Sequence, residues 1–93
     1  MKMEQFESVW DAIEDTPEEA AQMKIRSALM IAVKKHIKAQ GWTQVEAARH
    51  LGVTQPRISD LMRGKIALFG TDSLIALLAA AGLEVEVSVK EAA

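Results

Sequence analysis

Gly52 is the position that most constrains this chain, because it separates two short stretches that each carry the signals of a helix. Thr43 and Glu46 have the three-residue spacing of a capping box and predict the start of the first helix. Gly52 is expected to end it, since glycine readily adopts the positive φ of a turn after a helix. Thr54 then predicts the cap of a second helix, with Pro56 in its first turn, where a missing N–H costs little.

Both helices are expected to have one apolar face, and Gly64 is expected to close the second. The apolar residues are Ala47, Ala48 and Leu51 in the first helix and Ile58, Leu61 and Met62 in the second. The outward face of the second helix carries Gln55, Ser59, Asp60 and Arg63, with Arg57 on its flank. Because these polar side chains can bond base edges, residues 43–64 predict a helix-turn-helix whose second helix enters the major groove of DNA. An ordinary αα-hairpin would need the same glycine and apolar residues but has no reason to expose this set.

The formal net charge of −2 is unfavourable for binding a polyanion until it is divided along the chain. Residues 1–22 have a balance of −6 and residues 66–93 a balance of −3, whereas residues 23–65 carry nine Lys and Arg against two acids, a balance of +7. Phosphate attraction depends on the local field rather than on the total charge. The basic segment contains the two-helix unit and the helix before it, so the acidic total does not exclude nucleic-acid binding.

Several function classes are not supported by the composition. The chain of 93 residues fits one small domain with one core, and it has no cysteine for disulfides or zinc thiolates. Since no glycine-rich phosphate loop, nucleophile motif or metal motif is present, we expect no enzyme, metal or cofactor. Without a signal pattern or an apolar run of membrane length, we expect a cytoplasmic protein with no membrane partner.

The first residues predict a short amphipathic helix over residues 4–14. Phe6, Val9, Trp10 and Ile13 follow the i, i+3, i+4, i+7 spacing of one helix face, and the other face is acidic. This helix either packs on the domain's own core or binds a partner. Two large aromatic side chains in so short a segment suit an interface anchor.

A long helix is predicted next, from the capping pair Thr16 and Glu19 to about Gly41. Its expected core stripe is Ile25, Ala28, Leu29, Ala32, Val33 and Ile37. Met30 and Ile31 make the apolar face wider than one stripe needs, and we expect the N-terminal helix or a second subunit to cover them.

The last part of the chain predicts a loop, a helix and a strand. Apolar anchors in the loop are expected to be Ile66, Leu68 and Phe69, and the helix, capped by Thr71 or Asp72, is expected to bury Leu74, Ile75, Leu77 and Leu78. The alternation in L-E-V-E-V-S-V-K, residues 83–90, predicts the only clear strand. A lone strand leaves its backbone groups unpaired. We therefore expect it to pair with the same strand of a second copy about a two-fold axis, through Leu83, Val85, Val87 and Val89.

The motif T-Q-V-E-A-A-R-H-L-G-V-T-Q-P-R-I-S-D-L-M-R-G resembles the Cro/repressor-like, or XRE, helix-turn-helix family over about residues 22–82. Within that family the chain is most similar to HigA-type antitoxins, the partners of RelE/HigB-type toxins. The similarity lies in Gly41–Gly64, in Leu68-Phe69 and in the strand at residues 83–89. It implies a mainly α, lambda-repressor-like helix-turn-helix bundle of about five helices with one short C-terminal β-strand that pairs across a dimer.

The chain divides accordingly into three parts: an N-terminal acidic helix (residues 1–16), a DNA-binding domain (17–82) and a dimerisation strand and tail (83–93). The resemblance implies that Gln55 is the main base reader, since glutamine can pair with adenine through two hydrogen bonds. The further base-reading positions are Arg57, Ser59 and Asp60, and the phosphate-binding positions are Thr43, Gln44, Thr54, Arg63 and Lys65. Pro56 replaces the polar residue that many repressors carry, which leaves only a thymine methyl contact there.

The resemblance implies a function as well. We expect a homodimer that binds a palindromic double-stranded DNA operator in a prokaryotic cell, where it is associated with the nucleoid when bound. It would repress its own operon and neutralise a RelE/HigB-type toxin through Phe6, Val9, Trp10 and Ile13. Two alternatives remain open: a free-standing XRE-family regulator without a toxin, and a protein-interaction module on the same fold.

Overall fold

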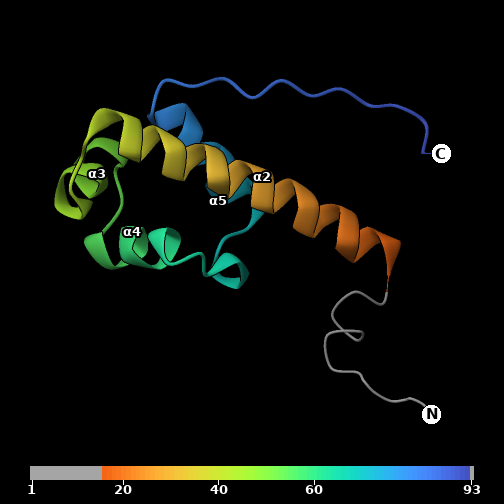
Figure 1. The fold of residues 1–93 in the computed structure, drawn as a ribbon, viewed down its shortest axis with the longest axis horizontal. Coiled ribbons are helices and arrows are strands. Elements are labelled where there is room, and N and C mark those ends of the chain that lie inside the picture. Colours follow the sequence, from red (N-terminus) through yellow and green to blue (C-terminus); the bar gives the residue numbers. More distant parts are fainter. Residues whose placement is uncertain (1–15, 93) are drawn as a thin grey trace, which may run out of the picture.

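The fold is a bundle of helices arranged around one long helix. A computed structural model describes residues 16–92 (Figure 1). In chain order the elements are α2 (Pro17–Gln40), α3 (Gln44–Leu51), α4 (Gln55–Met62), the 3-10 helix η1 (Ile66–Leu68) and α5 (Thr71–Ala80). Figure 1 shows α5 along α2, with α3 and α4 grouped around the C-terminal half of α2. The expected mainly α helix-turn-helix fold is confirmed, whereas the helix predicted at residues 4–14 lies outside the described residues.

The predicted starts of α2 and α3 are confirmed by their caps. The Thr16 hydroxyl accepts a hydrogen bond of 3.0 Å from the Glu19 amide at the start of α2. In α3 the capping box is complete: the Glu46 amide donates to Thr43 Oγ1 at 3.1 Å, and the Thr43 amide donates to Glu46 Oε1 at 2.8 Å. Two amides that the helix itself leaves without acceptors are thereby satisfied.

The turn between α3 and α4 depends on Gly52. Its φ of 72° lies in the left-handed region, and its N–H donates to the Ala48 carbonyl at the end of α3. The chain then reverses, and the Thr54 hydroxyl accepts from the Arg57 amide at 3.4 Å to cap α4. A side chain at position 52 would strain this backbone, so the angle between α3 and α4 depends on the glycine.

The core lies where α2, α3, α4 and α5 meet. Its largest fully buried side chains are Phe69, Ile58, Leu61, Leu74 and Val33. Met30 is 4% exposed and belongs to this core, so it needs no cover from a further helix or subunit. Ile31 is 55% exposed. Its cover by the N-terminal helix or by a second subunit therefore stays a prediction.

Several expected core positions are exposed instead. Ile25 is 53% exposed, because it lies on the N-terminal half of α2, which extends past the other helices (Figure 1). Ile75 on α5 is 43% exposed, and Leu68 in η1 is 49% exposed beside the fully buried Phe69. A contiguous apolar run is wider than the face that one neighbouring helix can cover, so its flanking members remain in solvent.

The start of α5 also differs from the prediction. Gly70 occupies the N-cap position, and no side chain caps the helix. Thr71 and Asp72 are the first helical residues rather than the cap. The Gly70 carbonyl accepts from the Leu74 amide at 3.1 Å, so the helix begins one residue earlier than a Thr71 cap and two residues earlier than an Asp72 cap would require.

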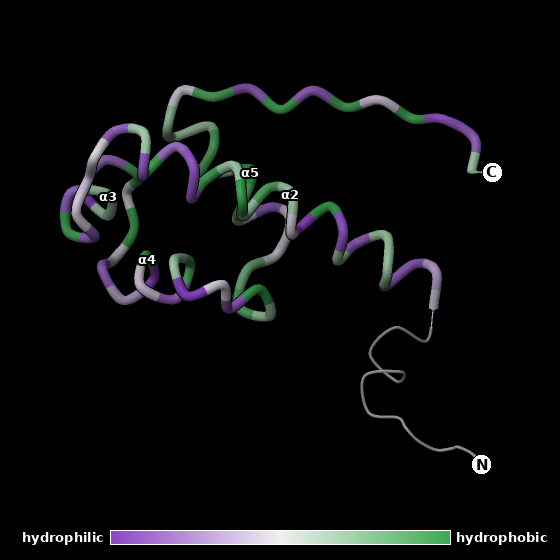
Figure 2. The backbone as a smooth tube through the Cα atoms, in the orientation of Figure 1, coloured by the Kyte–Doolittle hydropathy of each residue, from purple (hydrophilic) through white to green (hydrophobic). Residues whose placement is uncertain are grey.

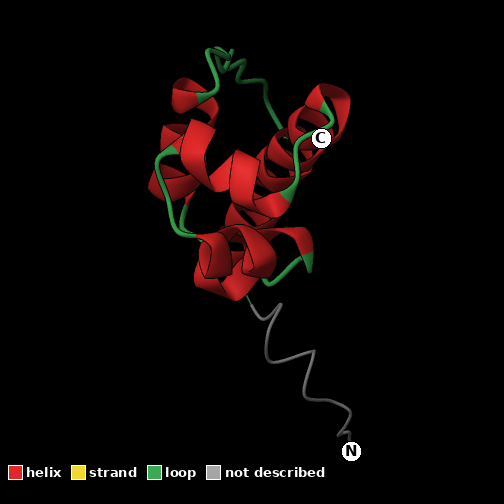
Figure 3. Ribbon diagram, turned by 90° about the vertical axis from the view of Figure 1, so that its left-hand side faces the viewer, coloured by secondary structure: helices red, strands yellow, loops and turns green. Residues whose placement is uncertain are grey.

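The C-terminal strand is not seen. Residues 83–92, hereafter the tail, run as an extended chain away from the end of α5, and the described residues contain no strand (Figures 1 and 3). Figure 2 shows that apolar and polar residues alternate along this extended chain. A strand is defined by its ladder of hydrogen bonds, and no other segment of the described chain lies alongside the tail to form one.

Candidate nucleic-acid interface

The outer face of α4 presents polar side chains at its N-terminal end. Gln55 is the first residue of this helix and is exposed, as is the next residue, Pro56. Ser59, one turn further on, is half-buried. Within residues 16–92, the side chains of Gln55 and Ser59 make no hydrogen bond, so their donors and acceptors are available to a ligand. A helix with such a face fits the major groove, where base edges present complementary groups.

The N-terminal end of α3, the helix that precedes α4, forms the second part of the surface. Thr43 and Gln44 are both exposed, and the Gln44 amide has no acceptor within the described residues. The hydrogen bond from the Thr43 amide is the main reason that the pKa of Glu46 lies below its ordinary value. The Thr43 amide is thus already used, whereas the Gln44 amide and side chain remain available to an anion at this helix N-terminus.

A charged cluster follows at the C-terminal end of α4. The Asp60 carboxylate lies 3.1 Å from Arg63 Nη2 and 3.8 Å from Lys65 Nζ. Arg63 and Lys65 are 60% and 48% exposed, so both cations face solvent while Asp60 holds them close together. This arrangement suits a phosphate contact by two cations, and it occupies the carboxylate that was predicted to read a base.

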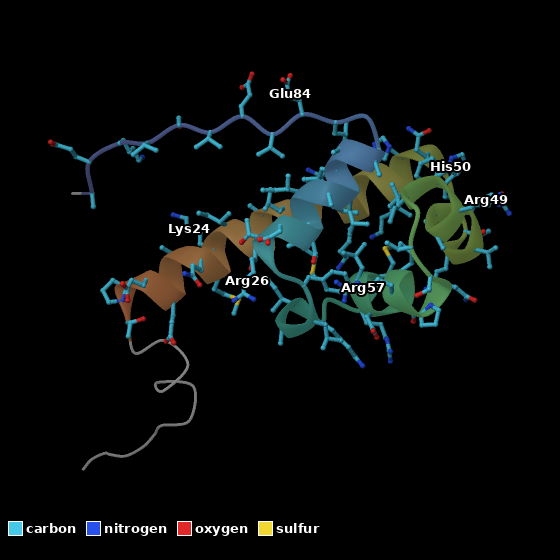
Figure 4. The ribbon with its side chains drawn as sticks, turned by 180° about the vertical axis from the view of Figure 1, so that it is seen from behind. Lys24, Arg26, Arg49, His50, Arg57 and Glu84 are labelled. Atoms are coloured by element: carbon cyan, nitrogen blue, oxygen red, sulfur yellow. The ribbon has the colours of Figure 1, made fainter. Side chains whose placement is uncertain are left out.

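The structure places Arg57 in a different environment from that of a base reader. Its Nη1 atom donates to the Leu68 carbonyl at 2.8 Å, and its guanidinium carbon lies 4.0 Å above the ring centroid of the buried Phe69. Figure 4 shows the Arg57 side chain between α4 and the elements that follow it. The contact is a cation–π interaction combined with a hydrogen bond, and it ties α4 to the η1 loop.

No sequence pattern predicts this contact, which joins residues eleven and twelve positions apart through an irregular loop. Spacing rules apply within a helix or between paired strands, and neither relates Arg57 to Phe69. The Leu68 carbonyl and the Phe69 ring are the partners of Arg57 in the described chain, and its contact with a base stays a prediction.

An aromatic cluster connects the end of α2 with α3. The rings of Trp42 and His50 are stacked, with centroids 4.2 Å apart and an interplanar angle of 6°. His36 meets the other side of the cluster edge-on, with its ring centroid 5.5 Å from that of Trp42. These contacts hold α3, and with it the start of the proposed phosphate site, against the last turns of α2. In Figure 4 Arg49, the neighbour of His50, points outward from the same helix.

Other predicted positions lie away from this surface. In the tail, Val87 and Val89 are 80% and 92% exposed, whereas Leu83 and Val85 are 39% and 36% exposed. The positions predicted to bind a toxin, Phe6, Val9, Trp10 and Ile13, lie outside the described residues. Within residues 16–92 no three potential metal-ligating side chains of the His, Cys, Asp or Glu type come together, and no helix has the length and apolar character to span a membrane.

Comparisons with known proteins agree with this geometry. A family model described as a helix-turn-helix domain matches residues 12–90. A solved structure provisionally described as an XRE-family transcriptional regulator is similar at 28% sequence identity and a TM-score of 0.73, and the match covers 80% of this chain and 83% of that chain. A comparison with curated proteins found no match.

The paired helices α3 and α4, the glycine turn between them and the polar face of α4 define a DNA-binding protein of the helix-turn-helix class. The chain belongs to the helix-turn-helix domain family matched over residues 12–90. With its structural similarity to an XRE-family regulator, this makes it a DNA-binding transcriptional regulator.

Proposed function

We propose that the chain is a homodimeric repressor that binds a palindromic double-stranded operator, with α4 of each subunit in a major groove. The observation that carries this proposal is the contrast on α4 itself. Gln55 is exposed, Ser59 is half-buried and neither side chain has a hydrogen-bond partner in the described chain, while Arg57 and Asp60 are engaged within it. Base readout is thereby concentrated on Gln55, with Ser59 in support.

Phosphate contacts surround that reading face on both sides. Gln44 supplies an amide and a side chain at the start of α3, with Thr43 and Thr54 at the two helix starts. Arg63 and Lys65 supply cations at the other end of α4. Contacts on both sides would fix the position of α4 in the groove, which base contacts alone do not do.

A second copy is needed because one short helix reads only one half-site. The tail supports a homodimer, since its backbone groups are extended and unpaired and Val87 and Val89 are almost fully exposed. Two copies related by a two-fold axis would bind a palindrome with half-sites one helical turn apart, or about 34–36 Å.

The test selects the sequences that the protein binds from a pool of random-sequence DNA over several rounds, and then measures their affinities by gel-shift titration. The proposal expects the enriched sequences to contain inverted repeats, and a DNA with one half-site alone to bind far more weakly. Enrichment of single, non-repeated sites would contradict the dimer. No enrichment of any sequence, with the protein folded, would instead support a protein-interaction module on the same fold.

The finer role that we propose is that of an antitoxin, which represses its own operon and neutralises a RelE/HigB-type toxin. It is supported by the resemblance of residues 41–64 and by the acidic balance of −6 in residues 1–22, which complements a basic, RNA-cleaving partner. In this role the protein binds and does not catalyse, and Phe6, Val9, Trp10 and Ile13 provide the apolar contact. It would act in the prokaryotic cytoplasm and at the nucleoid.

Coexpression with the product of the adjacent gene tests this role. If that product is a small basic RelE-like protein, the proposal expects it to copurify with the chain and to lose its RNA cleavage. The variant Trp10→Ala should weaken the complex while leaving the gel shift unchanged. An adjacent gene without such a product, or a toxin that does not copurify, would favour the free-standing regulator.

A further inference from the structure

The tail has the properties of an unpaired strand with two different faces. Its last backbone hydrogen bond to the helices runs from the Leu83 amide to the Leu78 carbonyl at 2.9 Å, and residues 84–92 make none with the described chain. Figure 4 shows Glu84 pointing away from the helices. By the alternation of an extended chain, Val85, Val87 and Val89 then face the side of the helices, yet the last two remain exposed.

The occupant that fits this strand is the tail of a second copy, and this inference rests on the homodimer proposed above. Two neighbouring strands related by a two-fold axis perpendicular to their ribbon run antiparallel, and the position of the axis along the strands sets which residues are opposed. Directly opposed residues share a face of the ribbon. Valines therefore oppose valines only if the axis passes through a residue; an axis between two residues would oppose every valine to a polar side chain.

We propose that the two-fold axis passes through Val87. This register sets Val85 opposite Val89 of the partner subunit and Glu86 opposite Ser88 of the partner subunit. It also sets Glu84 opposite Lys90 of the partner subunit, and the symmetry forms this charge pair twice. Residues 84–90 of each chain are then matched, with an apolar face toward the helices and a charge-paired face toward solvent.

The neighbouring registers are less favourable for reasons of charge or burial. An axis through Val85 sets Glu84 opposite Glu86 twice, and an axis through Glu86 sets that carboxylate opposite its own copy. Like charges directly opposed destabilise a ribbon. An axis through Ser88 pairs Glu86 with Lys90, but it sets Val85 opposite Glu91 and so places a carboxylate on the apolar face. Parallel in-register strands would oppose each glutamate to its own copy.

Charge exchange tests the pairing of Glu84 with Lys90. Glu84→Lys turns two attractive pairs into two repulsive ones, so we expect the dimer dissociation constant to rise about tenfold or more. The double variant Glu84→Lys/Lys90→Glu restores opposite charges and should recover most of the dimer by sedimentation. Glu86→Lys is the matched control, because it faces Ser88 in this register and should leave the dissociation constant within about threefold of the parent. A double variant no better than the single, or a larger loss with Glu86→Lys, overturns the register.

Cysteine cross-linking fixes the position of the axis, and the chain has no native cysteine to interfere. Directly opposed Cα atoms lie about 4.5–5.5 Å apart, within the range that a disulfide bridges, and residues displaced by two positions lie beyond it. Val87→Cys should therefore give a covalent dimer on mild oxidation, whereas Glu86→Cys and Ser88→Cys should not. Preferential linking at position 86 or 88 overturns the register.

The outcomes also separate this inference from the proposed repressor. A protein that selects inverted repeats but links at none of these positions dimerises through another surface, which overturns the register and leaves the repressor intact. A protein that links at position 87 but selects no inverted repeat retains the register and loses the repressor.

Discussion

The helix-turn-helix unit at residues 43–64 and the tail at residues 83–92 differ in where their backbone groups are satisfied. In the first, the Thr43–Glu46 capping box, the Gly52 amide and the Thr54 cap provide partners at the start and end of α3 and at the start of α4. In the second, nothing in the described chain accepts or donates beyond Leu83. The first region satisfies the backbone groups at these helix ends within a single copy, whereas the backbone groups of the second beyond Leu83 have no partner in the described chain.

The same contrast applies to the side chains. Ile58 and Leu61 of α4 are fully buried by their own chain, while Val87 and Val89 of the tail are 80% and 92% exposed. Removing apolar surface from water stabilises a fold in proportion to the area buried. The helix-turn-helix unit has already gained that stabilisation, and in the proposed dimer the tail would gain it from a second chain. The DNA-reading surface should therefore fold without the dimer, whereas operator affinity should depend on it.

Truncation after Leu83 is the strongest test of this division. The shortened chain keeps every hydrogen bond and core contact of the helices, so its helical circular dichroism and its unfolding midpoint as a monomer should be unchanged. Loss of the second binding site should weaken binding to a two-half-site operator by about 10²–10⁴-fold. Affinity for a single half-site, measured in the same titration, should stay the same. A truncated chain that light scattering still shows as a dimer would disprove the tail's role.

Substitution of Gln55 by alanine has the next largest expected effect, and it probes the complete region without disturbing it. The exposed side chain makes no hydrogen bond within the described chain, so the free energy of unfolding should change little. Loss of its base contact should cost about 1–3 kcal/mol on the cognate operator. Binding to random DNA should be unaffected in a competition assay. An equal loss on cognate and random DNA would show that Gln55 contacts phosphate rather than a base.

Arg57→Ala should show the reverse pattern. The variant loses the hydrogen bond to Leu68 and the contact with the Phe69 ring, which should lower the free energy of unfolding by about 1–2 kcal/mol in urea titrations. Its preference among operator base pairs should remain that of the parent. Arg49→Ala, which removes an exposed arginine from α3, is the control and should change stability by less than about 0.5 kcal/mol. Unchanged stability together with relaxed base preference would show that Arg57 contacts a base rather than stabilising the fold.

Lys65→Ala should have a smaller effect that extends to all DNA sequences. Removing one phosphate contact should make the dependence of log affinity on log salt shallower by about 0.9. Lys24→Ala is the matched control and should keep the parent's salt dependence. Figure 4 places Lys24 on the side of α2 that faces away from α4, whereas Arg26 lies on the side of α4. Equal slopes for Lys65→Ala and the parent would exclude Lys65 from the interface.

The sequence predicted most of the helix-turn-helix unit because the signals there are local. Thr43 and Glu46 are three residues apart, and Gly52 adjoins the helix that it ends, so pairwise rules apply directly. Such rules assigned Arg57 to base reading and could not predict the contacts that it makes within the chain. Its partners, the Leu68 carbonyl and the Phe69 ring, are placed by a loop whose path no periodicity describes.

The tail shows the other limit. The alternation in residues 83–90 predicted a β-strand with one apolar face, and the described residues are extended there but form no strand. The ladder of hydrogen bonds that would make it a strand is absent from the described chain, and in the proposed dimer a second chain would supply it. In the same way, a stripe of apolar residues on α2 did not show that its first half extends past the other helices, so Ile25 was expected in the core and lies in solvent.

The smallest predicted effect concerns the capping box, the device by which the start of α3 is completed within one chain. The Thr43 amide, first among several causes, holds the pKa of Glu46 below its ordinary value. The unfolded chain therefore binds a proton at a higher pH than the folded chain does. The stabilisation is fully present above the unfolded pKa and is lost as the pH falls through the lowered, folded one. Unfolding titrations of Glu46→Gln between about pH 5 and 3 should show a shallower loss of stability than the parent.

Thr43→Ala separates the two hydrogen bonds of the capping box: the variant should lose about 1 kcal/mol of stability at neutral pH. It should nevertheless keep most of the parent's pH slope, because the amide that chiefly lowers the pKa remains. If Thr43→Ala abolished the slope, the hydroxyl and not the amide would be the group that holds the Glu46 carboxylate.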